Sequence, residues 1–373
     1  MKKFLIFIVA AAFVFASVLP AVAQDKSVTI SGWATLMTFW DDDDARSKAN
    51  STAFDDTDLS WASSGATSFL DFKFKEGPVG GHIRVRPAGD VGDDIAHLYG
   101  WWEFGAGTFY VGNAPIPNEK EAALVTRGGA SAYGSMSWQS RGQSLQLKFP
   151  LGNGTFWVAA IKPSTLAAGS VYSGTADTDV MIPKLEASYD IKFGSFHVYL
   201  AGGYQTYDEV NTSNDKEYDI SSWFLGTYLS WAMGPFSVNA NVWTFENPVE
   251  YGYSDALLGA VGNTATDAIY DVDGFGWHVA AKYVVSDKLN FAVGYGNAKY
   301  ERDNDATVGT STQGHYEDEQ SMWYVNATIT LFKNVLMYPE VGVKDYKDKE
   351  DPTNGVTEEN DTTWYGFKWR IRF

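Results

Sequence analysis

Residues 362–373, TTWYGFKWRIRF, decide the fold. Apolar or aromatic side chains occupy every second position, and the positions between them end in three cationic side chains. Successive side chains of a strand point to opposite faces, so the stretch predicts a strand with one apolar and one largely cationic face. A strand between lipid and a water-filled lumen requires this pattern. The apolar face carries Tyr365, Phe367, Trp369, Ile371 and Phe373, and the other face carries Lys368, Arg370 and Arg372.

The N-terminal residues have the layout of a secretory signal peptide. Two lysines precede the apolar run 4–19, and an A-x-A cleavage motif follows at 21–23. A transmembrane anchor is the alternative, but the run is short for a span. We therefore expect residues 1–23 to be removed and residues 24–373 to form a single membrane domain.

Composition limits the classes of protein that remain. The 373 residues include 14 Trp, 21 Tyr and 23 Phe but no Cys, and the formal net charge is −18. The lack of Cys excludes disulfides, thiolate metal sites and cysteine nucleophiles. A strongly acidic chain is a poor partner for nucleic acid, because phosphate binding needs basic surface. After residue 23 no apolar run approaches the roughly 20 residues of a membrane helix, so a membrane location requires a closed barrel.

Alternating hydrophobicity along the chain predicts sixteen strands. Seven tight turns and eight longer connections separate them in strict alternation, which is the asymmetry of outer-membrane barrels with short periplasmic turns and long extracellular loops. The expected fold is an all-β, 16-stranded antiparallel transmembrane β-barrel. Its strands are expected at 27–40, 67–75, 81–86, 95–104, 108–113, 136–149, 155–162, 183–192, 195–207, 219–232, 236–246, 273–285, 289–300, 319–331, 335–346 and the closing stretch.

Charge is distributed unevenly over this pattern. Most acidic residues fall in six long connections, and the rest of the mature chain is mildly basic. The parity of the strands turns a set of basic residues toward the lumen, because Lys or Arg on the lipid face costs roughly 2–4 kcal/mol at the midplane. The acidic connections are 41–65, 163–182, 208–219, 247–273, 301–318 and 347–361.

The chain resembles the sixteen-stranded general porins of Gram-negative outer membranes over its whole mature length. The resemblance rests on the closing strand, on VTISGWATLMTF (28–39), on FLDFKFKEGPVGGHIRVRP (69–87) and on HLYGWWEFGAGTFYVGNAPIP (97–117). More narrowly, the chain is similar to the homotrimeric porins of sulfate-reducing bacteria. The resemblance implies a homotrimer, a location among outer-membrane lipids and lipopolysaccharide, and recognition of the closing strand by the barrel assembly machinery.

The resemblance also implies a constriction inside the pore. In the family the third loop folds into the lumen, and its acidic residues face a basic cluster on the early strands. Here that loop is 114–135, and it departs from the family in lacking a PEFGG element. Opposed charges across a narrow passage would create a transverse field and bias ion selectivity. By position the loop acids are Glu119 and Glu121, and the basic wall comprises Lys73, Arg84, Arg86 and Lys148.

The sequence favours a passive channel for small hydrophilic solutes and ions, with no cofactor. A substrate-selective channel is the alternative: the basic wall could favour oxyanions, and Trp243, Phe245 and Tyr338 could line a sugar path. A barrel with an adhesive or structural role is a third possibility. The acidic run 41–44 lacks the spacing of a calcium loop and is expected to be a solvated extracellular tip. No motif places a nucleophile beside a base, so we expect no enzyme.

Overall fold

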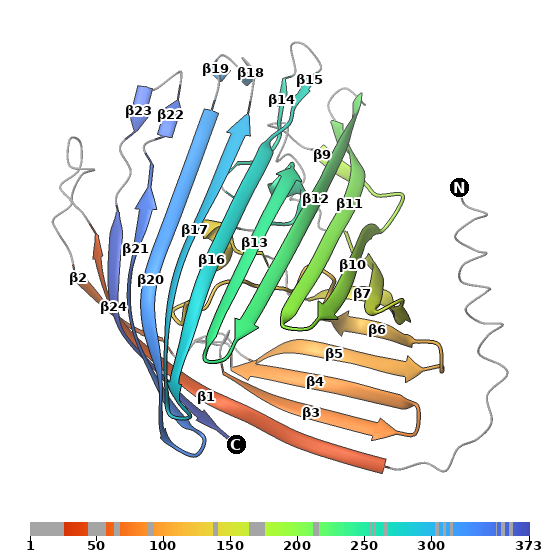
Figure 1. Ribbon diagram of the computed structural model, residues 1–373. Coiled ribbons are helices and arrows are strands. Elements are labelled where there is room, and N and C mark those ends of the chain that lie inside the picture. Colours follow the sequence, from red (N-terminus) through yellow and green to blue (C-terminus); the bar gives the residue numbers. More distant parts are fainter. Residues whose placement is uncertain are drawn as a thin grey trace.

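The computed structural model describes most of the chain after residue 25 (Figure 1). The expected signal peptide, 1–23, lies outside the described residues. Those residues are 26–43, 57–62, 68–87, 93–136, 141–163, 176–211, 216–253, 255–256, 258–263, 268–302, 306–308, 311–313, 316–347, 349–351, 355–357 and 361–373.

Within these residues, sixteen antiparallel strands form a closed barrel, as predicted, and each pairs with the next along the wall. Strand β1 closes the barrel: residues 26–33 pair with β3, and residues 33–43 pair with β24. The wall strands are β1 (Lys26–Asp43), β3 (Phe69–Glu76), β4 (Val79–Pro87), β5 (Asp93–Glu103), β6 (Thr108–Ala114), β7 (Gly142–Leu151), β8 (Gly154–Ile161), β10 (Lys184–Phe193), β11 (Phe196–Asn211), β12 (Lys216–Met233), β13 (Phe236–Glu246), β16 (Asp273–Ser286), β17 (Leu289–Arg302), β20 (Tyr316–Phe332), β21 (Val335–Tyr346) and β24 (Thr362–Arg372).

Shorter elements extend the wall or lie in the loops. Strands β2 (Thr57–Ala62), β9 (Ala176–Asp179), β22 (Lys349–Asp351) and β23 (Gly355–Thr357) continue the main sheet. Two hairpins pair β14 (Val261–Asn263) with β15 (Ala268–Tyr270) and β18 (Ala306–Val308) with β19 (Ser311–Gln313). A 3₁₀ turn, η3 (Ala130–Tyr133), and a short helix, α2 (Pro248–Tyr251), complete the described elements. In the described part of the chain, no helix is long and apolar enough to cross a membrane.

Side chains alternate between the two faces of the wall. On β17, Phe291 and Val293 are 47% and 50% exposed, whereas Ala292 between them is 5% exposed. On β24, Tyr365 and Trp369 are exposed, whereas Lys368 is buried. The exposed rows form an apolar outer surface that faces lipid. Polar groups are disfavoured on this surface because lipid would strip them of their hydration.

Strand length divides the barrel into a low side and a tall side. Strands β3, β4, β6 and β8 contain seven to nine residues, whereas β11 and β12 contain 16 and 18. At about 3.3 Å per residue, the longer strands extend roughly 30 Å further. In Figure 1, β3–β6 lie nearly crosswise to the tall strands β12–β20.

Tight turns fix the register of the hairpins. Glu76 pairs with Val79 across the two-residue turn 77–78, in which Gly77 has a φ of 56°. A side chain there would be strained, so glycine permits the short connection. This register places Asp71 directly opposite Arg84.

Several strand boundaries differ from the prediction, and two of them concern the interior of the barrel. The sixth wall strand, β7, begins at Gly142, not at 136, because the preceding chain is held inside the barrel; residues 137–140 lie outside the described part. Strand β1 continues to Asp43, although 41–44 was expected to be a solvated tip. Asp41 Oδ2 instead accepts a hydrogen bond of 2.5 Å from Arg127 Nη2, so that expectation was wrong for Asp41.

Candidate functional site

Residues 115–136, called loop 3 from here on, connect β6 to β7 and fold into the lumen. At the start of the loop, Pro115 O accepts a hydrogen bond from Gln146 Nε2 on β7 (2.8 Å), and Pro117 O accepts one from Tyr199 on β11 (2.5 Å). These donors are inward side chains of the wall. The loop therefore runs along the inner surface of the barrel, not over its rim.

The middle of loop 3 is held by one carboxylate. Glu340 on β21 accepts hydrogen bonds from the backbone N–H groups of Thr126 (2.5 Å) and Arg127 (2.9 Å), and from Trp364 Nε1 (3.1 Å). Lys368 Nζ donates to the carbonyl of Thr126 at 2.8 Å. A buried carboxylate that accepts several N–H donors is well satisfied, so Glu340 fixes this part of the loop.

The end of loop 3 packs beneath the tall strands. Figure 1 shows η3 inside the barrel behind β16 and β17, and it contacts both strands and β20. Gly134 O accepts hydrogen bonds from Asn241 Nδ2 (2.7 Å) and Trp243 Nε1 (2.9 Å). A Cβ on Gly134 would lie 2.1 Å from the carbonyl oxygen of Asn297. Glycine therefore allows the loop to approach the wall this closely.

A second segment, residues 247–253, 255–256 and 258–260, also folds inward; we call it the α2 segment. Its Tyr251 donates to Glu186 Oε1 on β10 at 2.8 Å, and the same oxygen accepts from Asn118 of loop 3 at 3.0 Å. Tyr253 donates to the carbonyl of Ser131, again in loop 3. The two inward segments are therefore bonded to one another and to one part of the wall.

The covered part of the wall is aromatic and dry. Trp243 and Phe245 are 1% and 0% exposed and pack against Tyr251, Tyr253 and Tyr300. The expectation that Trp243, Phe245 and Tyr338 line a sugar path is therefore wrong, since all three are buried. We call β10–β24, with the two segments that lie on it, the covered wall.

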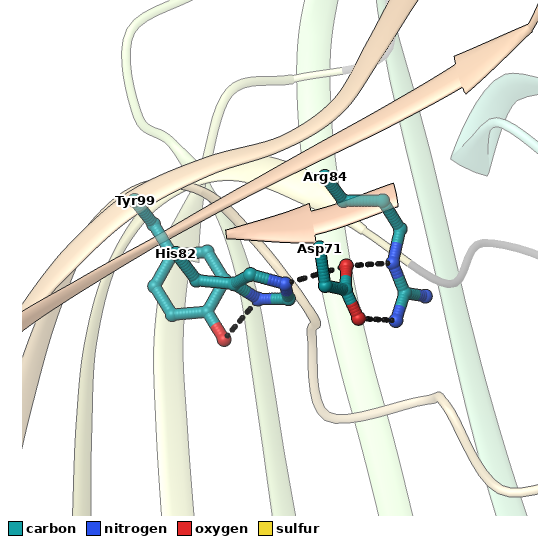
Figure 2. A network of polar contacts seen from close by, with 4 residues as sticks. All are labelled: Asp71, His82, Arg84 and Tyr99. Atoms are coloured by element: carbon teal, nitrogen blue, oxygen red, sulfur yellow. Dashed lines mark hydrogen bonds and ion pairs between the residues drawn. The ribbon is translucent and has the colours of Figure 1, made fainter. Parts of the chain in front are cut away.

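The inward face of β3–β7, called the basic wall, carries a polar network (Figure 2). Arg84 donates two hydrogen bonds to Asp71, Nε to Oδ1 at 2.7 Å and Nη2 to Oδ2 at 2.8 Å. His82 Nε2 lies 2.8 Å from Asp71 Oδ1, and its Nδ1 lies 3.1 Å from Tyr99 Oη. The Arg84 guanidinium also stacks on Phe69, 3.6 Å from the ring centre. The charge of Arg84 is thus locally neutralised.

The other predicted wall residues differ in exposure. Lys73 is exposed and Arg86 is partly exposed. Lys148 is partly exposed, with Nζ 4.3 Å above the Trp157 ring. Glu119 of loop 3 is partly exposed and Glu121 is exposed.

The cationic face of β24 is divided between two environments. Lys368 lies under loop 3, as described above. The Cζ atom of Arg370 lies 4.7 Å from the centre of the Trp33 ring and 5.5 Å from the centre of the Tyr338 ring. Arg372 is exposed. In the described part of the chain no group of three or more His, Asp or Glu side chains is arranged to hold a metal ion.

Sequence reasoning missed three residues of the site. Asp71 was not recognised as the partner of Arg84, although the register of a two-residue turn pairs the two. Glu340 and Glu186 hold loop 3 from strands far away in sequence, and no local signal marks them. The α2 segment did carry a signal, because Pro248, Tyr251 and Tyr253 interrupt an otherwise polar connection.

Comparisons with known proteins agree with this architecture. A family profile described as Gram-negative porin matches residues 8–349. Comparison with curated protein sequences returned no match. Solved structures with this fold include the outer membrane channel DcaP of Acinetobacter baumannii, with a TM-score of 0.69 and 15% identity over 93% of this chain and 97% of that one.

Two further structures have the same fold. The anion-selective porin from Comamonas acidovorans has a TM-score of 0.61 and 13% identity over 94% of this chain and 100% of that one. The trimer form of OmpT from Vibrio cholerae has a TM-score of 0.60 and 12% identity over 93% of this chain and 99% of that one. The match to the family profile covers most of the chain, and it indicates a channel rather than an enzyme. The chain belongs to the Gram-negative porins, outer-membrane β-barrels that form channels for the passive diffusion of solutes.

Proposed function

We propose that small hydrophilic solutes and ions cross this porin between loop 3 and the basic wall, and that the passage prefers anions. Loop 3 and the α2 segment occupy the lumen along the covered wall, where they are bonded to β10, β13, β20, β21 and β24. The space that remains for water lies on the side of β3–β7. The proposed path contains no catalytic step.

The single observation that carries this proposal is the contrast in exposure across the lumen. Lys73 on β3 is exposed, whereas Ala298 on β17 and Met322 on β20 are 0% exposed. All three residues face inward, so the wall near Lys73 meets solvent, whereas the wall at Ala298 and Met322 is covered. Charged side chains that line such a passage set its ion selectivity.

The preference for anions follows from which charges are compensated. Lys73 presents an exposed cationic group along the proposed path, and Lys148 lies on the same wall, where Glu119 of loop 3 interacts with it. Asp71 is occupied by Arg84 and His82, so it adds little negative potential to the passage. The exposed charge on the wall is therefore mainly positive, which raises the local anion concentration.

Planar-bilayer recordings test the proposal. We expect stable channel steps with a nearly linear current–voltage relation, and a reversal potential in a salt gradient that indicates anion preference. The double variant Lys73→Ser/Arg86→Ser should move the reversal potential toward cations. Stable steps with unchanged selectivity in that variant would show that the path does not follow the basic wall, and a lack of channel steps would contradict the proposal entirely.

We also propose a homotrimer in the outer membrane, with each subunit a separate pore. The trimer form of OmpT has the same fold, and the low strands β3–β6 form a side that a neighbouring subunit could cover. Residues 1–23 would be removed on export, and residues 24–373 would form the single barrel domain. The outward row of β24, from Tyr365 to Ile371, would contact the barrel assembly machinery, and the acidic loops would face lipopolysaccharide.

A further inference from the structure

A recess opens into the lumen where loop 3 passes β7–β11. Its empty volume is about 240 Å³ when the open solvent at its mouth is included. Residues of neighbouring strands form the floor of the recess. Lys148 on β7 pairs with Trp157 on β8, and Asp190 on β10 pairs with Tyr199 on β11. Loop 3 forms the opposite side and contributes Glu119 and Lys120.

Loop 3 is fixed at this point by the wall. Tyr199 donates to Pro117 O at 2.5 Å, and its oxygen lies 2.9 Å from Ser188 Oγ. Asn118 is bonded to the buried Glu186 at 3.0 Å. The two residues that immediately precede Glu119 are therefore anchored, so the carboxylate of Glu119 is held at the mouth of the recess.

The recess contains two carboxylates and two ammonium groups that do not neutralise each other directly. Lys148 Nζ lies over the Trp157 ring at 4.3 Å, and Lys120 Nζ lies over the Tyr199 ring at 5.4 Å. Asp190 Oδ1 lies 2.8 Å from His197 Nε2. Aromatic faces attract cations, so rings hold both lysines in place at the edge of the recess.

Glu119 faces these ammonium groups at longer range. Burial raises the pKa of the Glu119 carboxyl, and the charges of Lys148 and Lys120 offset part of that rise. Lys148 and Lys120 therefore compensate the ionised carboxylate only in part. A cationic group of a solute would supply the missing partner, since charge-assisted hydrogen bonds are stronger than neutral ones.

We propose that this recess is a subsite for small zwitterions, solutes that carry one ammonium and one carboxylate group, such as α-amino acids. The solute ammonium would bind Glu119, and the solute carboxylate would bind Lys148. A simple cation or anion would meet one attractive and one repulsive charge here, whereas a zwitterion satisfies both. This inference rests on the proposed path, because solutes must reach the recess from that lumen.

Flux measurements on the full chain in liposomes test the subsite. Glycine is the zwitterionic probe, and glycolamide is a neutral probe of the same size. We expect glycine flux to saturate with concentration and glycolamide flux to rise linearly. Glu119→Gln and Lys148→Met should each raise the half-saturating glycine concentration about tenfold, the loss expected for one charge-assisted hydrogen bond. Lys288→Met, at an exposed periplasmic turn, is the matched control and should leave saturation unchanged.

A charge exchange separates binding from structural damage. Glu119→Lys and Lys148→Glu should each abolish saturation, and the double variant should restore it, because a zwitterion can bind in the reverse orientation. Equal saturation by both probes, or a double variant no better than the single ones, would overturn the subsite. In those cases stable anion-preferring conductance would leave the proposed function intact, whereas loss of channel steps in the wild type would contradict both.

Discussion

On the covered wall, the inward carboxylates Glu186 and Glu340 accept hydrogen bonds from loop 3. On the basic wall, the inward carboxylate Asp71 accepts hydrogen bonds from Arg84 and His82 of the same wall. On the covered wall, inward carboxylates therefore hold loop 3 in the lumen. On the basic wall, the inward carboxylate binds its own wall and the lumen beside it stays open. The difference depends on whether the wall offers its acceptors to a loop or satisfies them internally.

Substitution of Arg84 should have the largest effect on this comparison. Arg84→Met removes both hydrogen bonds to Asp71, whose side chain is 6% exposed. Asp71 would keep only His82 as a partner, and breaking a buried ion pair by removing one member costs about 3 kcal/mol, so we expect the free energy of unfolding to fall by that amount. Denaturant titration followed by gel mobility measures it. The double variant Arg84→Met/Asp71→Asn should recover most of the loss, and a double variant as unstable as the single one would show that the pair is not the cause.

Release of loop 3 from the covered wall should have the second-largest effect. Glu340→Ala leaves the backbone N–H groups of Thr126 and Arg127 without their acceptor, at a cost of about 2 kcal/mol. We expect larger and noisier single-channel conductance, because the loop can then leave the wall. Glu76→Ala, at an exposed periplasmic turn, is the control. Unchanged noise in Glu340→Ala would show that other contacts suffice to hold the loop.

The α2 segment should loosen as pH rises. Burial raises the pKa of Glu250 from 4.5 to about 7, and the hydrogen bond from Ala260 N–H lowers it only in part. A carboxyl with a raised folded pKa stabilises the fold fully below pH 4.5, and this contribution is lost as pH rises through about 7. The hydrogen-exchange protection factors of residues 249–253, which are corrected for the faster intrinsic exchange at higher pH, should therefore be lower at pH 8 than at pH 6. Glu250→Gln should remove this difference, and an equal difference in that variant would exclude Glu250 as its source.

Removal of a single exposed charge should have the smallest effect. Lys73→Met leaves the hydrogen bonds of the basic wall intact, since Lys73 is exposed and lies beside the Asp71 network. We expect a shift of a few millivolts in reversal potential toward cations and no change in stability. A shift larger than that of Lys73→Ser/Arg86→Ser would show that Lys73 acts through more than its charge.

The alternation of side chains made the wall predictable, and the interior was less so. Lipid penalises any outward charge, so strands such as β17 and β24 carry a clear period of two. The Asp71–Arg84 pair could have been predicted from the sequence, because the two-residue turn at Gly77 fixes the register of the two strands. The bond between Thr126 and Glu340 could not, because no periodic pattern relates residues 214 positions apart. The inward fold of the α2 segment was missed because its connection was read by its acidic charge and not by Tyr251 and Tyr253.

Cysteine accessibility tests most directly the claim that solutes follow the basic wall. The chain has no native Cys, so Lys73→Cys and Ala298→Cys can be compared on a clean background. We predict that a charged methanethiosulfonate reagent added to open channels modifies Lys73→Cys rapidly and changes its current, while Ala298→Cys, at a buried inward position, stays unmodified. Equal reaction rates at the two positions, or faster reaction at residue 298, would contradict the account.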